Sequence, residues 1–320
     1  MRFLMSLVLI AWCFISSQLH AQAFDLNLSG SGARAEGFGQ AFIGISDDAT
    51  AVVWNPGGLT QLRRPEVSAV GRMVSEASGS HTKVNFASFA YPITRDLVVA
   101  GVYQEQIDFT FDIGGGFKSD GGAKTVSIGG AYRITPVISA GAVVNSWFGS
   151  VEYDFQGFPF EEKSKGINGV VGIMADLNGL DNAIPLKIGV VARSTGAKPI
   201  EDFKLPWMYG LGASYRIGEN ITVASDLEMR NFGSIDGGKN TTQFRAGGEY
   251  LWVTDNFVIP VRGGFRTVPQ PFGGKTSKGF SGGTGLILKQ IALDATFTHL
   301  INSDIGNTNI VMASAIVYFR

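Results

Sequence analysis

The feature that most constrains this chain is a series of short alternating segments that fills most of its length. From Glu66 to Phe319, segments of about ten residues alternate apolar and polar side chains with a period of two, as a β-strand with two different faces does. About ten residues is also the length that a tilted strand needs to cross a bilayer. Fourteen such segments can be counted, and an even number permits a closed antiparallel barrel.

The links between these segments alternate in length. Short links are expected at 93–95, 135–136, 178–185, 218–219, 253–256 and 289. Long links, rich in Gly, Asp and Ser, are expected at 106–122, 150–165, 196–206, 231–240, 269–277 and 301–308. Short turns on one side and long loops on the other are the connectivity of an outer-membrane β-barrel. The predicted fold class is therefore all-β, a transmembrane barrel of about fourteen antiparallel strands.

The two faces of the segments support this prediction. In 220–230, one face carries Ile221, Val223, Leu227 and Met229, and the other carries Thr222, Asp226, Glu228 and Arg230. The first face suits lipid, and the second predicts a lumen with charges of both signs that pair with one another. Aromatic residues near the short turns predict a girdle at one interface: Tyr91, Tyr132, Tyr215, Tyr250, Trp252, Tyr318 and Phe319. A soluble β-sandwich or propeller, whose strands alternate equally well, remains the alternative.

Composition and the first residues bound the compartment. The formal net charge of −1 gives no reason to expect nucleic acid binding. Arg2, the apolar run 3–15 and the small residues of Ala21-Gln22-Ala23 predict a Sec signal peptide over 1–23. The single cysteine, Cys13, lies inside that segment, so the mature chain is expected to have no disulfide and no thiolate metal site. The 43 glycine residues suit walls against which other backbone packs inside the lumen.

The segment 24–65 lacks the period-two alternation of the later segments and contains three motifs in order. They are Gly32-Ala33-Arg34-Ala35, Asp47-Asp48-Ala49-Thr50-Ala51 and Asn55-Pro56-Gly57-Gly58-Leu59. The segment resembles the amino-terminal signature of the FadL/TodX outer-membrane transport proteins and of the related PorV/PorQ family. The resemblance covers about thirty residues of motif and, beyond them, only the fourteen-stranded architecture.

This resemblance implies a domain organisation and a set of gating residues. Residues 24–65 would fold into the lumen as a hatch, and 66–320 would form the barrel. The hatch and ligand-gating residues would be Gly37, Gly39, Asp47, Asp48, Trp54, Asn55 and Pro56. Gly57 stands where the family has Ala, which we expect to loosen the backbone without removing the turn that proline fixes. The alternative is that these residues only help the barrel to fold and close.

Phenylalanines gather around the two longest predicted loops, 106–122 and 150–165. We predict a hydrophobic capture surface there, formed by Phe109, Phe111, Phe117, Phe155, Phe158 and Phe160. The alternative is a cluster in which these side chains bury one another.

The chain offers little chemistry. Gly279-Phe280-Ser281-Gly282-Gly283 matches the nucleophile-elbow pattern of hydrolases, and Asp294 and His299 follow it. That motif needs a strand-to-helix turn, whereas both flanks here are strands. Pairing of Leu288 with Ile291 would set Ser281 opposite Thr298, with His299 on the other face. We therefore expect no enzyme, no metal site and no cofactor, although a lipid hydrolase that uses Ser281 remains a third hypothesis.

Two hypotheses about function remain, one for a transport protein and one for a protein-binding component of a secretion system. The first is an outer-membrane barrel of a Gram-negative bacterium for passive transport of hydrophobic small molecules such as long-chain fatty acids. The second, which the resemblance also implies, is a PorV-like barrel of the type IX secretion system that binds the carboxy-terminal domains of secreted proteins. The expected partners are a hydrophobic small molecule or lipid, outer-membrane lipid and, in the second case, secretion-system proteins.

Overall fold

The computed structural model describes residues 31–76, 79–114, 117–155, 158–180, 184–194, 207–232, 238–270, 274–301 and 306–319. The predicted signal peptide lies outside these residues. Short helices come first: α2 (Ala33–Gly37), α3 (Ala51–Trp54) and the 3₁₀ helix η2 (Pro56–Gln61), with a second 3₁₀ helix, η3 (Leu177–Gly179), farther along. Among the described residues, no helix has both the length and the apolar character that crossing a bilayer requires.

The strands follow one another along the chain. They are β1 (Glu66–Glu76), β2 (Gly79–Pro92), β3 (Leu97–Gly114), β4 (Phe117–Arg133), β5 (Ile138–Phe155), β6 (Phe158–Asp176), β7 (Leu186–Ser194), β8 (Trp207–Ile217), β9 (Ile221–Asn231), β10 (Thr241–Val253), β11 (Val258–Val268), β12 (Ser277–Ile287), β13 (Ile291–Ile301) and β14 (Thr308–Tyr318).

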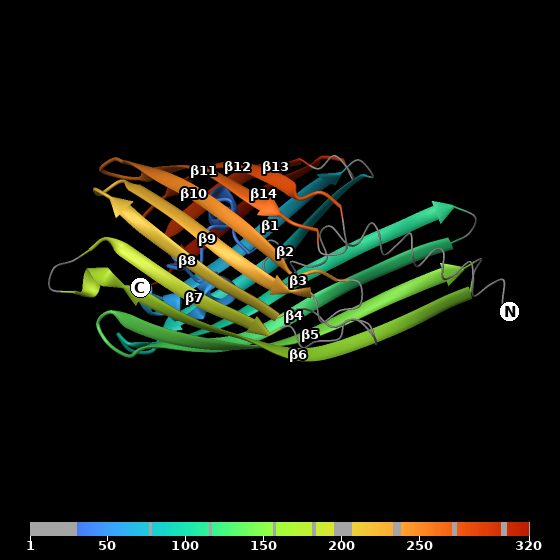
Figure 1. The fold of residues 1–320 in the computed structure, drawn as a ribbon, viewed down its shortest axis with the longest axis horizontal. Coiled ribbons are helices and arrows are strands. Elements are labelled where there is room, and N and C mark those ends of the chain that lie inside the picture. Colours follow the sequence, from blue (N-terminus) through green and yellow to red (C-terminus); the bar gives the residue numbers. More distant parts are fainter. Residues whose placement is uncertain are drawn as a thin grey trace.

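Each strand pairs with its neighbours in sequence, and β1 closes the sheet against β14, from Glu66 opposite Tyr318 to Ser75 opposite Asn309. The result is the closed antiparallel barrel of fourteen strands that the alternating segments predict (Figure 1). Because the ring is closed, every strand in it pairs with a neighbour on each side. The sheet therefore has no unpaired edge strand on which another chain could add and cause aggregation.

Four strands depart from the prediction. The segments 106–122 and 150–165, expected to be long loops, are instead the continuation of β3 into β4 and of β5 into β6. These strands have 17 to 19 residues, whereas most of the others have 11. Figure 1 shows them extending beyond the rest of the barrel. Among the described residues, β2 pairs with β3 only up to Gln104 and β7 pairs with β6 only from Gly169, so the described part of the extension is a four-stranded sheet.

The outer and inner faces have the predicted character. In β9, Ile221, Val223, Leu227 and Met229 are exposed on the outside, whereas Asp226, Glu228 and Arg230 are buried inside. Aromatic side chains near the short turns are also exposed, as a girdle requires: Tyr91, Tyr132, Tyr215, Tyr250, Trp252 and Phe319. Tyr318 is different, because it shares the inner row with the buried Ile316 and lies under the guanidinium of Arg64.

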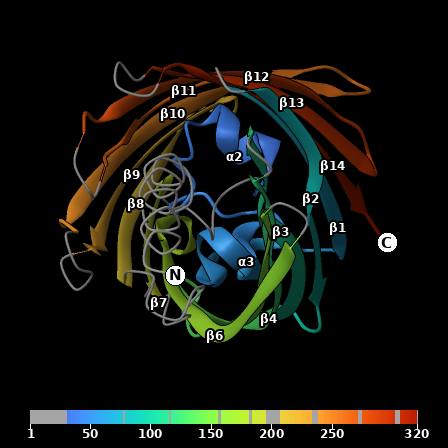
Figure 2. The ribbon, with the colours of Figure 1, turned by 90° about the vertical axis from the view of Figure 1, so that its right-hand side faces the viewer.

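Residues 31–65 lie inside the barrel, and we call them the plug segment. Figure 2 shows α2 and α3 enclosed by the ring of strands. From Ser31 to Thr60 every side chain is buried except those of Arg34 and Asp47, which are partly buried. Within this segment the helices are short turns: α2 spans Ala33–Gly37, α3 spans Ala51–Trp54 and η2 spans Pro56–Gln61. The largest group of buried apolar residues joins this segment to the inner faces of the strands.

Candidate functional site

The turn at Asn55 and Pro56 anchors the plug segment. Pro56 occupies the first position of η2, where its missing N–H costs nothing, and the Asn55 side-chain oxygen accepts a hydrogen bond from the Gly57 N–H at 3.1 Å. The Asn55 amide nitrogen donates to the carbonyl oxygens of Ile43, at 3.1 Å, and Ile173, at 3.0 Å. One fully buried side chain thus ties the turn both to an earlier loop of the plug and to strand β6.

Gly57 is a glycine because strand β6 is close. A Cβ atom built there would lie 2.9 Å from the Met174 nitrogen and 3.0 Å from the Gly172 oxygen, both of them backbone atoms. The expectation that glycine only loosens this turn is therefore wrong, since the residue is what allows the plug to touch the wall. Its neighbour Gly58 approaches the Ser46 oxygen still more closely, since a Cβ there would lie 2.1 Å from it.

We expect Gly57→Ala to destabilise the protein by about 1–3 kcal/mol, because the added methyl group overlaps backbone that cannot move aside. The midpoint of the thermal transition of the barrel in detergent measures the effect. Gly263→Ala is the matched control, since a Cβ at Gly263 would meet nothing within 4 Å. Equal midpoints for the two variants would show that the plug does not rest on β6 as described.

Glycines on several strands of the wall face the plug around much of the barrel. We call Gly141, Gly172, Gly189, Gly212, Gly247 and Gly264 the glycine ring; they lie on β5, β6, β7, β8, β10 and β11. A Cβ at any of them would come within 2.6 Å of a plug atom or of the Asp226 side chain that holds the plug. Gly39 is a plug residue that lies equally close to the wall: its φ is +62°, and a Cβ atom built on it would lie 2.5 Å from the Phe265 backbone nitrogen. Backbone therefore packs on backbone, as the glycine content predicts.

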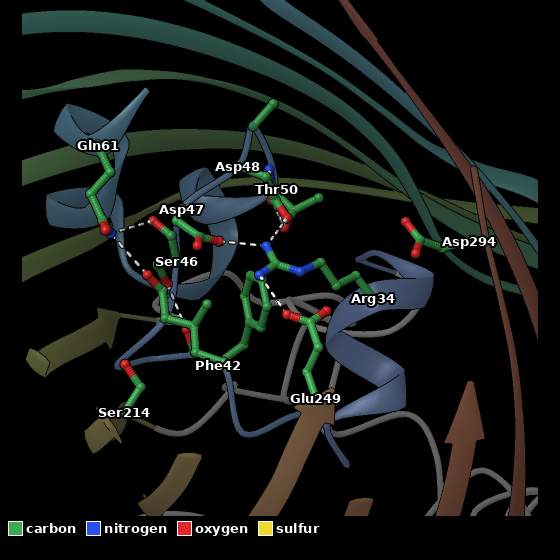
Figure 3. Close-up of polar contacts among 12 residues, drawn as sticks. Arg34, Phe42, Ser46, Asp47, Asp48, Thr50, Gln61, Ser214, Glu249 and Asp294 are labelled. Carbon is green, nitrogen blue, oxygen red and sulfur yellow. Dashed lines mark hydrogen bonds and ion pairs between the residues drawn. The ribbon is translucent and has the colours of Figure 1, made fainter. Parts of the chain in front are cut away.

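An ion cluster holds the first and second motifs together (Figure 3). The Arg34 guanidinium lies 2.5 Å from a carboxylate oxygen of Asp47, 3.5 Å from Asp48 and 3.6 Å from Glu249 on β10. Burial alone would lower the pKa of Arg34, but the three carboxylates raise it well above its usual value. Its guanidinium also lies 5.3 Å from the centre of the Phe42 ring, within range of a cation–π contact.

The pKa values of the two adjacent acids of this cluster shift in opposite directions. Burial raises the pKa of Asp47, but Arg34 and Lys187 lower it by more, so the net shift is downward. Burial also raises the pKa of Asp48; Arg34 opposes this and the charge of Asp47 adds to it, so the net shift is upward. Asp48 accepts hydrogen bonds from the Thr50 N–H and hydroxyl in addition to its ion pair with Arg34 at 3.5 Å.

These opposite shifts predict opposite effects of amide substitution. Asp47→Asn should destabilise the plug by about 1.5–3 kcal/mol at pH 7, because it removes the acceptor of a charge-assisted bond. The Asp47 contribution is present above its unfolded pKa and is lost as the pH falls through its lowered folded pKa.

Asp48→Asn should change stability little, because the Asn oxygen can still accept from Thr50. The pKa of Asp48 is higher in the folded protein than in the unfolded chain. Its carboxyl group therefore stabilises the fold at a pH below the unfolded pKa, and this stabilisation is lost as the pH rises through the folded pKa. Urea unfolding of both variants and of the unmodified protein between pH 2 and pH 8 measures the difference. A larger loss for Asp48→Asn would contradict the assignment.

A second ion cluster, on the barrel wall, holds α3. Glu228 of β9 pairs with Arg193 at 2.6 Å, Arg230 at 2.9 Å and Arg245 at 3.1 Å. Arg193 also donates to the carbonyl oxygen of Trp54 at 2.7 Å, at the carboxy-terminal end of α3. Arginine at that end satisfies carbonyls that the helix leaves unpaired. The lumenal charges thus pair with one another and with the plug.

Further wall residues bind the plug backbone directly. Asp226 accepts from the N–H groups of Phe42, at 2.8 Å, and Ile43, at 2.9 Å. Arg266 pairs with Glu36 of α2 at 2.5 Å, and burial, which would raise the pKa of Glu36, is outweighed by this arginine, so that pKa is lowered. The sequence pattern places Asp226, Glu228 and Arg230 on the inner face but does not identify their partners, because periodicity gives the face of a residue and not what lies opposite.

The predicted gating residues converge only in part. Trp54, Asn55 and Pro56 are buried together, and the Trp54 indole donates to the Ser31 oxygen at 2.9 Å while its ring packs edge-on against Phe42. Asp47 and Asp48 lie at the Arg34 cluster. Gly37 and Gly39 lie at the other end of the plug, where Gly37 faces Arg262 and Gly39 faces β11. Their role in gating remains a prediction.

The six predicted capture residues lie on strands rather than on loops. The register sets Phe109 opposite Gly121, Phe111 opposite Ser119 and Phe155 opposite both Phe117 and Phe158. A bulge between Glu105 and Ile107 shifts the register of β3 by one residue. The side chains of Phe109, Phe111, Phe117 and Phe155 lie outside the part of the chain that the structure describes. Phe158 and Phe160 lie on the same ladder face of β6 as the buried Asn168 and Val170. Phe158 and Phe160 are exposed, by 68% and 63%.

The residues of the hydrolase pattern do not form a catalytic triad. Leu288 and Ile291 pair across the turn, and Ser281 lies opposite Thr298, as the register argument predicts. The Ser281 hydroxyl donates to the Gly37 oxygen at 3.4 Å, and the Nδ1 of His299 contacts Asn309 instead. In the part of the chain that the structure describes, no three His, Cys, Asp or Glu side chains gather as a metal site would require.

Comparisons with known proteins agree on the fold. No protein-family model and no curated protein sequence matches the chain. Among solved structures, the CymD monoaromatic hydrocarbon channel superposes with a TM-score of 0.74 and 13% identity over 92% of this chain and 99% of that one. The toluene transporter TbuX of Ralstonia pickettii gives 0.73 and 15% over 92% and 100%. A FadL homologue of Pseudomonas aeruginosa gives 0.69 and 11% over 91% and 99%.

Identities this low establish the fold and not the cargo. The motifs of the plug segment, the closed ring of fourteen strands and these superpositions agree with one another. The chain is therefore a barrel of the FadL/TodX fold, with its amino-terminal segment inside the lumen.

Proposed function

We propose that the protein is a passive channel for hydrophobic small molecules in the outer membrane of a Gram-negative bacterium, to which the Sec pathway exports it. The observation that carries this proposal is a barrel with an apolar exterior whose lumen is filled by a separate segment bound through polar contacts. Side chains of the wall fill only a barrel of about eight strands, so a ring of fourteen strands would enclose an open lumen if this segment did not occupy it. A plug held by ion pairs and hydrogen bonds can exchange these partners for water or ligand.

The extended sheet of β3 to β6 supplies the capture surface in this proposal. Phe158 and Phe160 lie on the ladder face of β6 that continues the inner wall, so a molecule that adsorbs there is already on the lumenal side. Phe158 and Phe160, both exposed, are the part of this face that the structure describes in side-chain detail. Cargo then passes the plug when the segment around Asn55 and Pro56 shifts. Long-chain fatty acids are the cargo that we propose.

The test is equilibrium binding of a radiolabelled long-chain fatty acid to the purified barrel, followed by uptake into liposomes that contain it. Phe158→Ser together with Phe160→Ser should weaken binding by roughly tenfold or more, because each loses the burial of an aromatic ring against the ligand. Phe257→Ser is the matched control, an exposed phenylalanine in a turn at the opposite end of the barrel. Its binding should equal that of the unmodified protein.

Other outcomes would redirect the assignment. Binding of toluene without fatty acid would keep the channel and change the cargo. Binding of peptides from the carboxy-terminal domains of secreted proteins, without any lipid, would favour the PorV-like role in type IX secretion. Failure of both classes to bind would overturn the proposal.

A further inference from the structure

The second motif of the plug segment contacts the wall at Glu66. Glu66 is the first residue of β1, at the end of the barrel where the short turns lie, and it pairs with Tyr318 across the seam that closes the ring. It is 6% exposed, and one of its carboxyl oxygens accepts a hydrogen bond from the Ala49 N–H at 3.0 Å. This bond joins the Asp-Asp-Ala-Thr-Ala motif to the first strand of the barrel.

No ion pair offsets a negative charge on Glu66 in the part of the chain that the structure describes. Arg64, two residues earlier, has other partners. Its guanidinium lies 3.9 Å from the centre of the Tyr318 ring and donates to the Lys289 backbone oxygen at 2.9 Å. The charge of Arg64 therefore acts on Glu66 only through space, without a direct contact.

Hydrogen bonds do little to stabilise a charge on Glu66 either. Ser68 of β1 and Ser88 of β2 lie opposite each other on the inner rows next to Glu66, and both hydroxyls are buried without a hydrogen-bond partner. Among the described residues, the Ala49 N–H is therefore the one donor to Glu66. A buried carboxylate without a counter-ion is costly, and such a group takes up a proton instead. Neutral Glu66 can still accept the bond from Ala49 through its carbonyl oxygen.

Asp48, the residue before Ala49, also has no cation to itself. The Arg34 guanidinium lies 3.5 Å from Asp48, but it also lies 2.5 Å from Asp47 and 3.6 Å from Glu249 (Figure 3). Burial and the neighbouring charge of Asp47 raise the pKa of Asp48, and Arg34 opposes them incompletely. Two carboxyl groups that both favour the protonated form, those of Asp48 and Glu66, thus meet the same short segment of backbone.

The charged side chains around the motif include more acids than bases. The five acids are Asp47, Asp48, Glu66, Glu249 and Asp294, and the four bases are Arg34, Arg64, Lys187 and Arg262. Arg262 pairs with Glu249 at 2.6 Å and with Asp294 at 2.5 Å. The ammonium group of Lys187 contacts the Gln61 side-chain oxygen, and the phenol of Tyr318 adds no charge. At least one carboxyl group thus lacks a counter-charge, and Glu66, which has no ion pair, is the group that a proton neutralises first.

We propose that the contact between Glu66 and the second motif is a pH-sensitive switch: protons hold the plug segment in the lumen, and a rising pH releases it. Glu66 and Asp48 bind the protons, Glu66 before Asp48. In the docked plug both groups are buried and favour the neutral form, whereas in the undocked plug both are in water and ionise. The proposal rests on the proposed function only where it equates release of the plug with opening of the channel.

The ion conductance of the barrel in a planar bilayer, measured from pH 5 to pH 9, tests the switch. A carboxyl group that holds its proton only in the docked plug favours docking fully below the ordinary carboxyl pKa of about 4.3, and this advantage is lost as the pH rises through its pKa in the docked state. Between these values the population of undocked plug grows by up to about tenfold per pH unit. We therefore expect the conductance to rise by roughly tenfold or more over the measured range.

Glu66→Gln keeps an oxygen that accepts from the Ala49 N–H but has no proton to lose. At pH 9 its conductance should be lower than that of the unmodified barrel, and the addition of Asp48→Asn should make the pH profile flat. Glu219→Gln is the matched control, because it removes an exposed carboxyl group from the turn between β8 and β9 at the same end of the barrel. It should leave the rise unchanged. A rise that persists in the double variant, or a flat profile of the unmodified barrel, would overturn the switch.

Difference infrared spectroscopy gives a readout that does not depend on opening. The unmodified barrel should show the carbonyl band of a protonated carboxyl group at pH 5, and part of this band should be lost as the pH rises to 9. That part should be missing at every pH in Glu66→Gln. An identical band in the two proteins would mean that Glu66 holds no proton, which refutes the switch. If the band changes as expected and the barrel never conducts, the switch stands and the proposed channel does not.

Discussion

Glu228→Gln should be among the most destabilising single substitutions in this protein, with an expected loss of about 3–5 kcal/mol. The carboxylate is fully buried and pairs with Arg193, Arg230 and Arg245, two of which are fully buried themselves. Removing one charge leaves three guanidiniums in a space from which water is excluded. Because Arg193 also caps α3, part of the loss should appear as release of the plug. The urea midpoint of the barrel measures the total.

Glu161→Gln provides the control for this prediction. It removes the same charge from an exposed pair with Lys163, and such pairs contribute about 0–1 kcal/mol. If the two variants unfolded at the same urea concentration, the lumenal cluster would not be a main support of the fold. Recovery of the midpoint in Glu228→Gln combined with Arg245→Gln would show that uncompensated charge, rather than lost packing, causes the destabilisation.

Asn55→Ala should open the channel. The substitution leaves the oxygens of Ile43 and Ile173 and the N–H of Gly57 without partners in a buried turn, and we expect a loss of about 3 kcal/mol of plug docking. That loss raises the population of undocked plug by roughly 100-fold. The ion conductance of the barrel in a planar bilayer should rise accordingly, since water fills the lumen where the plug has left it.

A comparison at a site away from the plug makes this result specific. Asn220→Ala changes the same residue type in a turn between β8 and β9, where the backbone oxygen of Asn220, not its side chain, accepts from Leu251. Its conductance should match that of the unmodified barrel. If Asn55→Ala remained folded and left the ion conductance unchanged, the Asn55-Pro56 turn would not be what holds the plug in the lumen.

The regular part of the barrel could be predicted from the sequence because its physics is local. Alternation in β9 reveals which side chains face lipid, and the tight turn at Lys289 fixes the register of β12 and β13. The pairing of Ser281 with Thr298 follows from that turn by counting residues along the two strands. A strand with one apolar face has a single register that buries the correct side, and a tight turn removes the remaining freedom.

The long hairpins were not predictable in the same way. Segments 106–122 and 150–165 are rich in Gly, Asp and Ser, which are the residues that usually mark loops. Both faces of the extended sheet lie outside the apolar band, so alternation of apolar with polar residues does not extend into it. The bulge near Glu105 also shifts the register of β3 by one residue, and a strict period of two does not anticipate that shift.

The contacts of the plug depend on residues far apart in the chain. Arg34 and Glu249, or Asn55 and Ile173, meet only because the barrel has closed around the segment. The three motifs indicated that the segment lies inside the lumen, and the glycine content indicated close packing against the wall. Neither gave the partners, because no local preference of Arg34 or Asn55 distinguishes one wall residue from another.

The glycine ring bears on how the protein is assembled. The seam that closes the barrel joins Glu66 to Tyr318, a separation of 318 − 66 = 252 residues, so the wall is complete only after the last strand has been synthesised. The plug segment precedes β1 and is available throughout that interval. Its backbone packs against the ring without room for a Cβ atom, and Trp54 and Phe42 are buried between the plug and the wall, so a plug that docks before closure requires no later opening of these contacts. We infer that the barrel closes around a segment already seated, so each newly inserted molecule reaches the membrane without ever exposing an open pore.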